Sequence, residues 1–332
     1  MSSQPIVAIT GASAGVGRAI AAAFAERGWQ VAALARGDEG LAGTQREIER
    51  AGGRALAIEA DVSNASDVMR AAERVESEFG PIDVWVNNAM VTVYAPVVEI
   101  TPQEFEQVTR VTYLGQVYGT LAALKFMRAR NRGHIIFIGS ALAYRSIPFQ
   151  APYCAAKAAI RGFVDSLRSE LMNEGSKIRL TMLQLPAVNT PQFDWARNKF
   201  DCEVAPVPPI FQPETIANAV LRAVAEAPRE YWIGISAAKA IIAQMLMPAL
   251  LDRYLAKEGK ASETTSQPKK TGRPDNLFSA GQGDPGAHGR FDARASQHAF
   301  VFNPEWLRAG AAIGLLAASV VTLAKKGARP PP

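Results

Sequence analysis

Three side chains in the middle of the chain could together move a proton. Tyr153 and Lys157 stand at positions i and i+4, so a helix would place them on one face. Ser140 precedes them, at the end of an apolar run. A tyrosine with a pKa of about 10 exchanges protons poorly at neutral pH, but a nearby ammonium favours the phenolate and lowers that pKa. We expect Tyr153 to act as acid or base while Ser140 holds the substrate oxygen.

A glycine-rich stretch near the N-terminus, Thr10–Gly17, could hold a phosphate group. It lies between an apolar run and a helical pattern. Glycines allow a tight turn and a close approach of the backbone, and the N–H groups at the start of a helix attract anions. The alternative is a purely structural turn, which this context disfavours. The residues expected to bind the pyrophosphate of a dinucleotide are Gly11, Ser13, Gly15, Val16 and Gly17.

The end of the second apolar run indicates which dinucleotide is preferred. It reads Ala-Leu-Ala-Arg and ends at Arg36, with no acidic residue to accept hydrogen bonds from a ribose 2′-OH. An arginine can clamp a 2′-phosphate with two parallel hydrogen bonds. The sequence therefore favours NADP(H), with NAD(H) as the alternative. The competing interpretation is a solvated surface arginine, and Ala14 adds no second basic residue to the loop.

Short apolar runs alternate with helical patterns through residues 1–256. Strands are expected at Pro5–Thr10, Gln30–Ala35, Arg54–Glu59, Val84–Asn87, His134–Gly139, Ile178–Leu185 and Tyr231–Ile235. Helices are expected at Val16–Arg27, Leu41–Ala51, Ser66–Phe79, Pro102–Arg130, Ala151–Asn173 and Pro213–Ala227. This alternation predicts an α/β domain with a doubly wound parallel sheet, because the strands are apolar on both faces. Ligands bind at the carboxyl edge of such a sheet.

With these motifs the chain resembles the short-chain dehydrogenase/reductase family from about Pro5 to Ile235. The resemblance rests on the glycine loop, on Ser140 with the Tyr153–Lys157 pair, and on Asp61-Val62 and Asn87-Asn88-Ala89 after the third and fourth strands. It implies a Rossmann fold and a single catalytic domain. It also implies that Asp61 and Val62 flank the adenine, Asn88 and Ala89 line the cofactor, Thr190 contacts the nicotinamide carboxamide, and Lys157 binds the nicotinamide ribose and lowers the pKa of Tyr153.

Three positions depart from the family pattern. Met90 and Ala187 stand where the family usually has glycine. Thr112 replaces an asparagine that anchors a water molecule in the family's proton relay. A threonine can also bind a water, with shorter reach, so we expect Thr112 to take a catalytic part in an altered relay. Because the three central residues are intact, the chain is expected to be an enzyme.

Two aromatic residues follow Thr190 where this fold places its substrate lid. Phe193 and Trp195 would cover an apolar ligand; the alternative is a surface helix with buried aromatic residues. Together with Ser140 and Tyr153 they form the expected substrate site. The histidines share no metal-ligand spacing and there are 2 cysteines, so neither a metal site nor a disulfide framework is expected. Cysteine usage favours the cytoplasm.

Composition divides the chain into three parts: a catalytic domain at 1–256, a flexible linker at 257–304, and an apolar tail helix within 305–332. The net charge of +5 belongs to residues 257–332, which hold 11 Lys or Arg against 6 Asp or Glu. A neutral body argues against nucleic-acid binding. The run from Trp306 to Ala324 would reach about 28 Å as a helix, so we expect a membrane anchor. The alternative is a short apolar helix docked on the body or between subunits.

The leading hypothesis is an NADP(H)-dependent oxidoreductase that interconverts a lipophilic alcohol and a ketone or aldehyde. One alternative is reduction of 3-oxoacyl thioesters. Another is a non-catalytic NADP(H)-binding sensor or scaffold. The family resemblance also implies a homo-oligomer.

Overall fold

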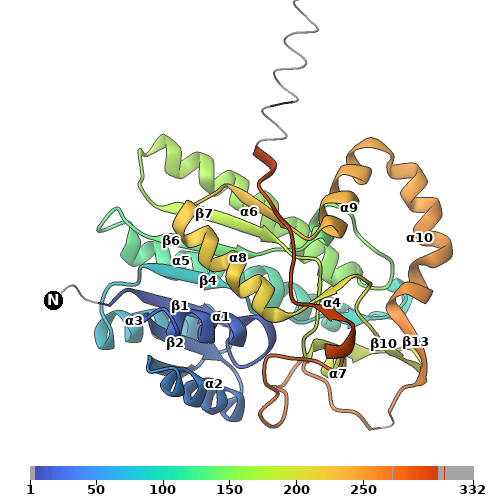
Figure 1. Ribbon diagram of the computed structural model, residues 1–332, viewed down its shortest axis with the longest axis horizontal. Helices are drawn as coiled ribbons and strands as arrows, with labels where there is room; N and C mark the ends of the chain where they lie inside the picture. Colours follow the sequence, from blue (N-terminus) through green and yellow to red (C-terminus); the bar gives the residue numbers. More distant parts are fainter. Residues whose placement is uncertain (1–3, 271, 306–309, 311–332) are drawn as a thin grey trace, which may run out of the picture.

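The computed structural model describes residues 4–270, 272–305 and 310. Its core is an eight-stranded sheet in the order β15-β12-β7-β6-β4-β1-β2-β3 (Figure 1). Every pair of neighbouring strands in it is parallel except β12 and β15. The strands are β1 (Ile6–Thr10), β2 (Gln30–Ala35), β3 (Arg54–Glu59), β4 (Val84–Asn87), β6 (His134–Ile138), β7 (Arg179–Gln184), β12 (Glu230–Ile233) and β15 (Val301–Phe302).

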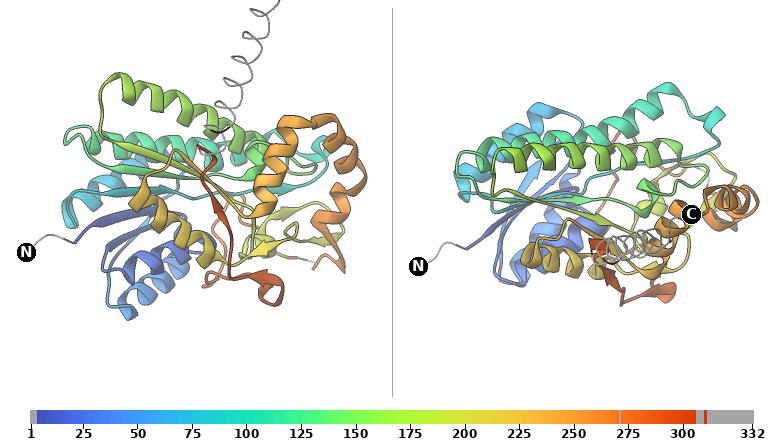
Figure 2. Two further views of the ribbon diagram at one scale, coloured as in Figure 1. Left: turned by 45° about the horizontal axis from the view of Figure 1, so that its top comes forward. Right: turned by 90° about the horizontal axis from the view of Figure 1, so that it is seen from above.

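Helices cover both faces of this sheet (Figure 2). One layer consists of α1 (Gly15–Ala25), α2 (Asp38–Arg50) and α8 (Pro213–Glu226), and the other of α3 (Ala65–Glu78), α5 (Gly115–Met127) and α6 (Ala151–Asn173). Two clusters of buried apolar side chains lie between the sheet and these layers. β1 and β6 are buried along their whole length, as expected for strands covered on both sides. The predicted doubly wound parallel sheet is confirmed.

Local sequence signals explain where several helices begin. Thr101 and Glu104 form a reciprocal capping box before α4 (Pro102–Val108), and the Asn64 side chain caps α3. The helix predicted over Pro102–Arg130 is a composite. A π-helical segment, Thr109–Leu114, joins α4 to α5. Such wide turns are frequent at functional sites, and this one contains Thr112.

The predicted boundary at residue 256 is wrong, because it falls inside a helix. After β12 the chain forms α9 (Ile235–Leu246) and α10 (Pro248–Glu263), which pack against each other as a hairpin. Much of the hairpin's outer surface is apolar and exposed. The prediction missed it because charged residues alternate with the apolar ones along α10, so the composition already resembles the segment that follows.

The flexible linker predicted at 257–304 is also wrong for the described residues. Short strands fasten this segment to the body: β13 (Thr264–Pro268) pairs with β10 (Cys202–Val204), and β14 (Ala295–Ser296) pairs with β11 (Ile210–Phe211), which also pairs with β8 (Ala187–Val188). β15 extends the main sheet. Leu277 is fully buried. Glycine and proline prevent regular helices here, but backbone hydrogen bonds and ion pairs hold the segment without any periodic pattern.

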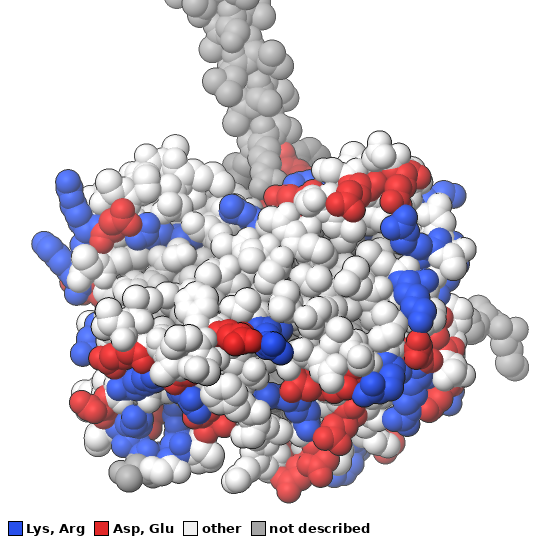
Figure 3. All heavy atoms as spheres, turned by 180° about the vertical axis from the view of Figure 1, so that it is seen from behind, with Lys and Arg blue, Asp and Glu red and all other residues white. Residues whose placement is uncertain are grey.

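Within the described residues, no helix is both long enough and apolar enough to cross a bilayer. The anchor predicted over 306–324 lies outside those residues. On the face seen in Figure 3, basic and acidic side chains are interspersed, without a continuous basic stripe.

Candidate active site

The carboxyl ends of the parallel strands open into a cavity of 510 Å³. It brings together most of the residues predicted from the sequence, whether they come from the glycine loop, from strand ends or from α6. Those that line it are Gly11, Ser13, Gly15, Val16, Arg36, Val62, Asn88, Ala89, Ser140, Tyr153, Lys157, Thr190, Phe193 and Trp195. Gly17, Asp61 and Thr112 do not line it.

The glycine loop has the tight backbone that a pyrophosphate site needs. Gly11 has a φ of +66°, which favours glycine, and a Cβ at Gly17 would lie 2.2 Å from the Gly11 carbonyl oxygen. Asn88 ties the end of β4 to this loop, because its Nδ2 donates to the carbonyl oxygens of Thr10 and Gly11 at 2.9 and 3.2 Å. The loop therefore leads directly into α1, and Gly11, Ser13 and Gly15 line the cavity.

Arg36 lies where the sequence predicts a 2′-phosphate contact. Its Nη2 donates to the backbone carbonyl oxygen of Asn276 at 2.8 Å. Nη1 is buried and has no hydrogen-bond partner among the described residues. Burial lowers the pKa of the guanidinium, and the Asp61 carboxylate opposes this. A buried N–H group without a partner costs stability, so an anion bound beside Arg36 would satisfy it.

The Asp61 side chain does not line the cavity but bonds to the backbone of the turn that follows β3. Its carboxylate accepts a hydrogen bond from the Ser63 N–H at 2.9 Å, which shapes the turn between β3 and α3. The neighbouring Val62 does line the cavity and packs against Gly115 of α5.

Ser140, Tyr153 and Lys157 meet in the cavity. Ser140 follows β6, and its Oγ accepts a hydrogen bond from the Leu142 N–H at 3.1 Å. Lys157 is almost completely buried, and its Nζ donates to the Ile138 carbonyl oxygen at 2.6 Å. The same Nζ lies 5.5 Å from the centre of the Tyr153 ring. One turn of α6 thus brings the phenol and the amine together, beside a hydroxyl that can still donate its proton.

Burial dominates the electrostatics of this pair. It raises the pKa of Tyr153, and the hydrogen bond with Ser140 only partly opposes the shift. Burial lowers the pKa of Lys157 to about 7. Burial thus disfavours the ammonium form of Lys157, and the lowering of the Tyr153 pKa by Lys157 stays a prediction. Anionic or hydroxyl groups bound nearby would favour the ammonium and strengthen its effect on Tyr153.

Thr112 is fully buried in the π-helical segment. Its hydroxyl donates to the Val91 carbonyl oxygen at 2.9 Å and accepts from the Val91 N–H at 3.1 Å. The proton of the hydroxyl is committed to the backbone, so the side chain fixes the segment after β4. Val91 itself lines the cavity.

The predicted lid is the short helix α7 (Gln192–Trp195). Phe193 packs edge-on against Phe291, with ring centres 5.8 Å apart, and Trp195 packs against Gly281. Both lid residues line the cavity. Among the described residues, no group of three or more potential metal ligands comes together.

Sequence reasoning missed several parts of the wall, and two of them come after β12. The α9–α10 hairpin contributes Ala240, Leu251, Tyr254 and Leu255, and the C-terminal segment contributes Asn276, Ala280, Gly281, Gly283 and Pro285. The helical spacing of Leu251 and Leu255 is a signal that could have revealed the first part. The second has only a glycine- and proline-rich composition, which is also typical of a linker.

Comparisons with known proteins agree with this geometry. The family model of short chain dehydrogenases matches residues 5–199. The uncharacterized oxidoreductase YxnA of Bacillus subtilis is 33% identical over 280 residues, which cover 84% of this chain and 79% of that protein. Human 17-beta-hydroxysteroid dehydrogenase 13 is 34% identical over 186 residues, covering 56% of this chain and 62% of the relative.

A solved structure is also similar. It is an alcohol dehydrogenase from Thermococcus sibiricus complexed with 5-hydroxy-NADP, with a TM-score of 0.60 and 28% identity. The match covers 69% of this chain and 95% of that one. The sequence match, the sheet order and the Ser140–Tyr153–Lys157 site lead to one conclusion: the chain belongs to the short-chain dehydrogenase/reductase family of NAD(P)-dependent oxidoreductases.

Proposed function

We propose that this protein interconverts a lipophilic alcohol and its ketone or aldehyde with NADP(H). One observation supports this most strongly: Ser140, Tyr153 and Lys157 line the same cavity as the glycine loop and Arg36. A single bound dinucleotide could therefore reach from the phosphate-binding loop to the proton-transfer group.

Each residue has a role that follows from its surroundings. The Ser140 hydroxyl donates a hydrogen bond to the substrate oxygen and fixes its position. Tyr153 gives its phenolic proton to that oxygen in reduction and takes it back in oxidation. Lys157 binds the nicotinamide ribose and, once charged, favours the phenolate. The nicotinamide supplies or accepts the hydride when it is bound.

The preference for NADP(H) is supported by Arg36. Arg36 lines the cavity, and its Nη1, which has no hydrogen-bond partner among the described residues, would donate to a 2′-phosphate bound there. NAD(H) carries a hydroxyl at this position and leaves the buried N–H without a charged acceptor.

A lipophilic substrate is supported by the walls of the cavity. Many of the lining side chains are apolar or aromatic: Met90, Val91, Leu142, Ile147, Phe193, Trp195, Leu251, Tyr254 and Leu255. Such a surface gains free energy by removing apolar substrate area from water, and it offers few partners for additional polar groups. The name of the human relative, a hydroxysteroid dehydrogenase, is compatible with this class.

The test is turnover of purified protein with NADPH and NADH against a panel of steroid, retinoid, aliphatic and 3-oxoacyl carbonyl compounds. We expect oxidation of NADPH with at least one lipophilic carbonyl and slower oxidation of NADH. Tight NADPH binding without turnover of any compound would favour the non-catalytic sensor. Preferential turnover of 3-oxoacyl thioesters would favour that alternative.

Two further predictions from the sequence stay open. We propose that the protein forms a homo-oligomer, as membership of the family favours. Analytical sedimentation of the purified protein would measure its oligomeric state. The membrane anchor over residues 306–324 also stays a prediction.

A further inference from the structure

A segment near the C-terminus, residues 275–289, crosses the side of the cavity where the adenosine half of a dinucleotide would lie. We call this segment the strap. Asn276, Ala280, Gly281, Gly283 and Pro285 line the cavity from the strap. From the body, Ser13, Arg36, Gly37 and Gly40 line the same region. Ala280 lies close to Gly37, and Pro285 lies close to Gly40.

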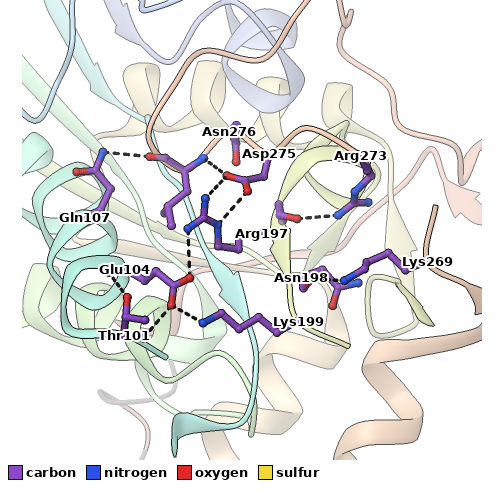
Figure 4. A network of polar contacts seen from close by, with 12 residues as sticks. Thr101, Glu104, Gln107, Arg197, Asn198, Lys199, Lys269, Arg273, Asp275 and Asn276 are labelled. Atoms are coloured by element: carbon purple, nitrogen blue, oxygen red, sulfur yellow. Dashed lines mark hydrogen bonds and ion pairs between the residues drawn. The ribbon is translucent and has the colours of Figure 1, made fainter. Parts of the chain in front are cut away.

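The first end of the strap is fixed by a polar network (Figure 4). The Asp275 carboxylate accepts from Arg197 Nε at 2.9 Å and from Arg197 Nη2 at 3.2 Å. Arg197 also pairs with Glu104, which is 6% exposed. The next anchor is Leu277, which is buried in the core and whose carbonyl oxygen accepts from Gln107 Nε2 at 3.0 Å. This end is therefore joined to α4 and to the strand that follows the lid.

The second end is fixed to the glycine loop and its two neighbouring helices. Asp284 pairs with Arg18 of α1, which is 4% exposed, and with Arg46 of α2. The Gly286 carbonyl oxygen accepts from the Gly15 N–H at 3.0 Å. A Cβ at Gly289 would lie 2.3 Å from the Thr190 carbonyl oxygen, so the strap backbone packs directly on the backbone before the lid.

Between these ends, the strap contacts Arg36, the residue that is expected to bind the 2′-phosphate of the cofactor. The Asn276 carbonyl oxygen accepts from Arg36 Nη2 and leaves Nη1 without a partner among the described residues. The Asn276 N–H in turn donates to the Trp195 carbonyl oxygen at 2.9 Å. The orientation of the guanidinium therefore depends on the strap, and the strap is joined to the lid.

We propose that the strap is part of the cofactor site: it retains the bound dinucleotide and positions Arg36 for the 2′-phosphate. The proposal rests on the proposed NADP(H)-dependent function. A dinucleotide lying between the glycine loop and the strap leaves only when the strap separates from α1, α2 and Arg36. The strap thus sets both the dissociation rate and the preference between NADPH and NADH.

Two substitutions loosen the strap by different means. Asp284→Asn removes the charge that pairs with Arg18 and Arg46. Gly43→Ala places a Cβ 2.2 Å from the present position of Asp284 Oδ2, so the carboxylate must move while every charge remains. Gly43 lies inside α2, where alanine favours the helix by about 1 kcal/mol, so a loss of folding does not explain its effect. The matched control is Glu47→Gln, which changes the other partner of Arg18 and leaves the strap in place.

The measurements are the dissociation rates and affinities of NADPH and NADH for the full-length protein, followed by nucleotide fluorescence. We expect both strap variants to release NADPH about tenfold faster, the factor that corresponds to about 1.4 kcal/mol. The ratio of NADPH to NADH affinity should fall several-fold, because Arg36 loses its fixed orientation. The control should release NADPH within about twofold of the parent rate, because the Glu47 carboxylate bonds to Arg18 and not to the strap.

The outcomes separate this proposal from the function on which it rests. Unchanged NADPH release in both strap variants, with normal binding by the parent, would refute the strap alone. Equal weakening of NADPH and NADH would refute the positioning of Arg36. A parent protein that binds neither dinucleotide would refute the proposed function and the strap together.

Discussion

Glu263 at the end of α10 is a buried carboxylic acid that has no charged partner among the described residues. It is 1% exposed. One carboxylate oxygen accepts from Gln150 Nε2 at 2.8 Å, and the other has no hydrogen-bond partner among the described residues. No Lys, Arg or His of the described chain pairs with it. Burial raises the pKa of Glu263 to about 7, and the hydrogen bond from Gln150 only partly opposes this. We predict that Glu263→Gln changes the pH dependence of stability.

The sign and size of this effect follow from the pKa. The carboxyl group ionises near 4.5 in the unfolded chain and near 7 in the folded protein, so between these values the folded state binds more protons. Its contribution to stability is present below pH 4.5 and is lost as the pH rises through 7. At about 1.4 kcal/mol per pH unit, the loss is about 3 kcal/mol by pH 8. The amide of the variant avoids this loss but leaves its own NH₂ without an acceptor, which costs about 1 kcal/mol.

Urea unfolding of the cofactor-free protein at pH 5 and pH 8, followed by tryptophan fluorescence, measures the difference. We expect Glu263→Gln to be more stable than the parent by about 1–2 kcal/mol at pH 8 and to have no advantage at pH 5. The matched control is Glu203→Gln, because Glu203 is equally buried but pairs with Arg273 at 3.2 Å. This control should lose stability at pH 8. Equal effects of Glu263→Gln at both pH values would refute the reasoning.

Three further predictions concern the cofactor and the tail. Arg36→Asp should lower the ratio of NADPH to NADH affinity about tenfold or more, since a charged hydrogen bond contributes about 1.5–3 kcal/mol; equal affinities in the parent would contradict the role of Arg36. Lys157→Ala should weaken NADPH binding in titrations and also slow turnover, whereas a change in only one of them would show that the residue has a single role. Full-length protein should fractionate with membranes while a chain ending at Glu305 stays soluble, a cut that retains β15; a soluble full-length protein would contradict the anchor.

The central part of the fold could be predicted because its signals are local and periodic. The apolar strands and amphipathic helices up to β12 follow from alternation, and α6 has the predicted bounds, Ala151–Asn173. The π-helical segment could not be predicted, because Thr109–Leu114 has an ordinary helical composition and its extra width depends on packing. The prediction for the C-terminal segment failed for a different reason. Its order depends on long-range contacts such as Arg18 with Asp284, which neither residue reveals in sequence.

The site shows the same division. The glycine loop, Ser140, Tyr153 and Lys157 were predictable, because their chemistry requires particular residue types at strand ends or at helical spacing. The state of those residues was not predictable, since the shifted pKa of Lys157 depends on how deeply the cavity wall buries it. Thr112 illustrates a further limit: a hydroxyl identified as a water-binding group instead bonds to the backbone of Val91.

The central claim is that Tyr153 transfers the proton while a bound dinucleotide exchanges the hydride. The most direct measurement is single-turnover oxidation of bound NADPH by a carbonyl substrate, in the parent and in Tyr153→Phe, with NADPH affinity measured in parallel. The ring and its packing survive this substitution, so NADPH should bind nearly as tightly as before. The rate should fall by about 10² to 10⁴, the usual contribution of a general acid. A variant that oxidises NADPH at nearly the parent rate would contradict the account.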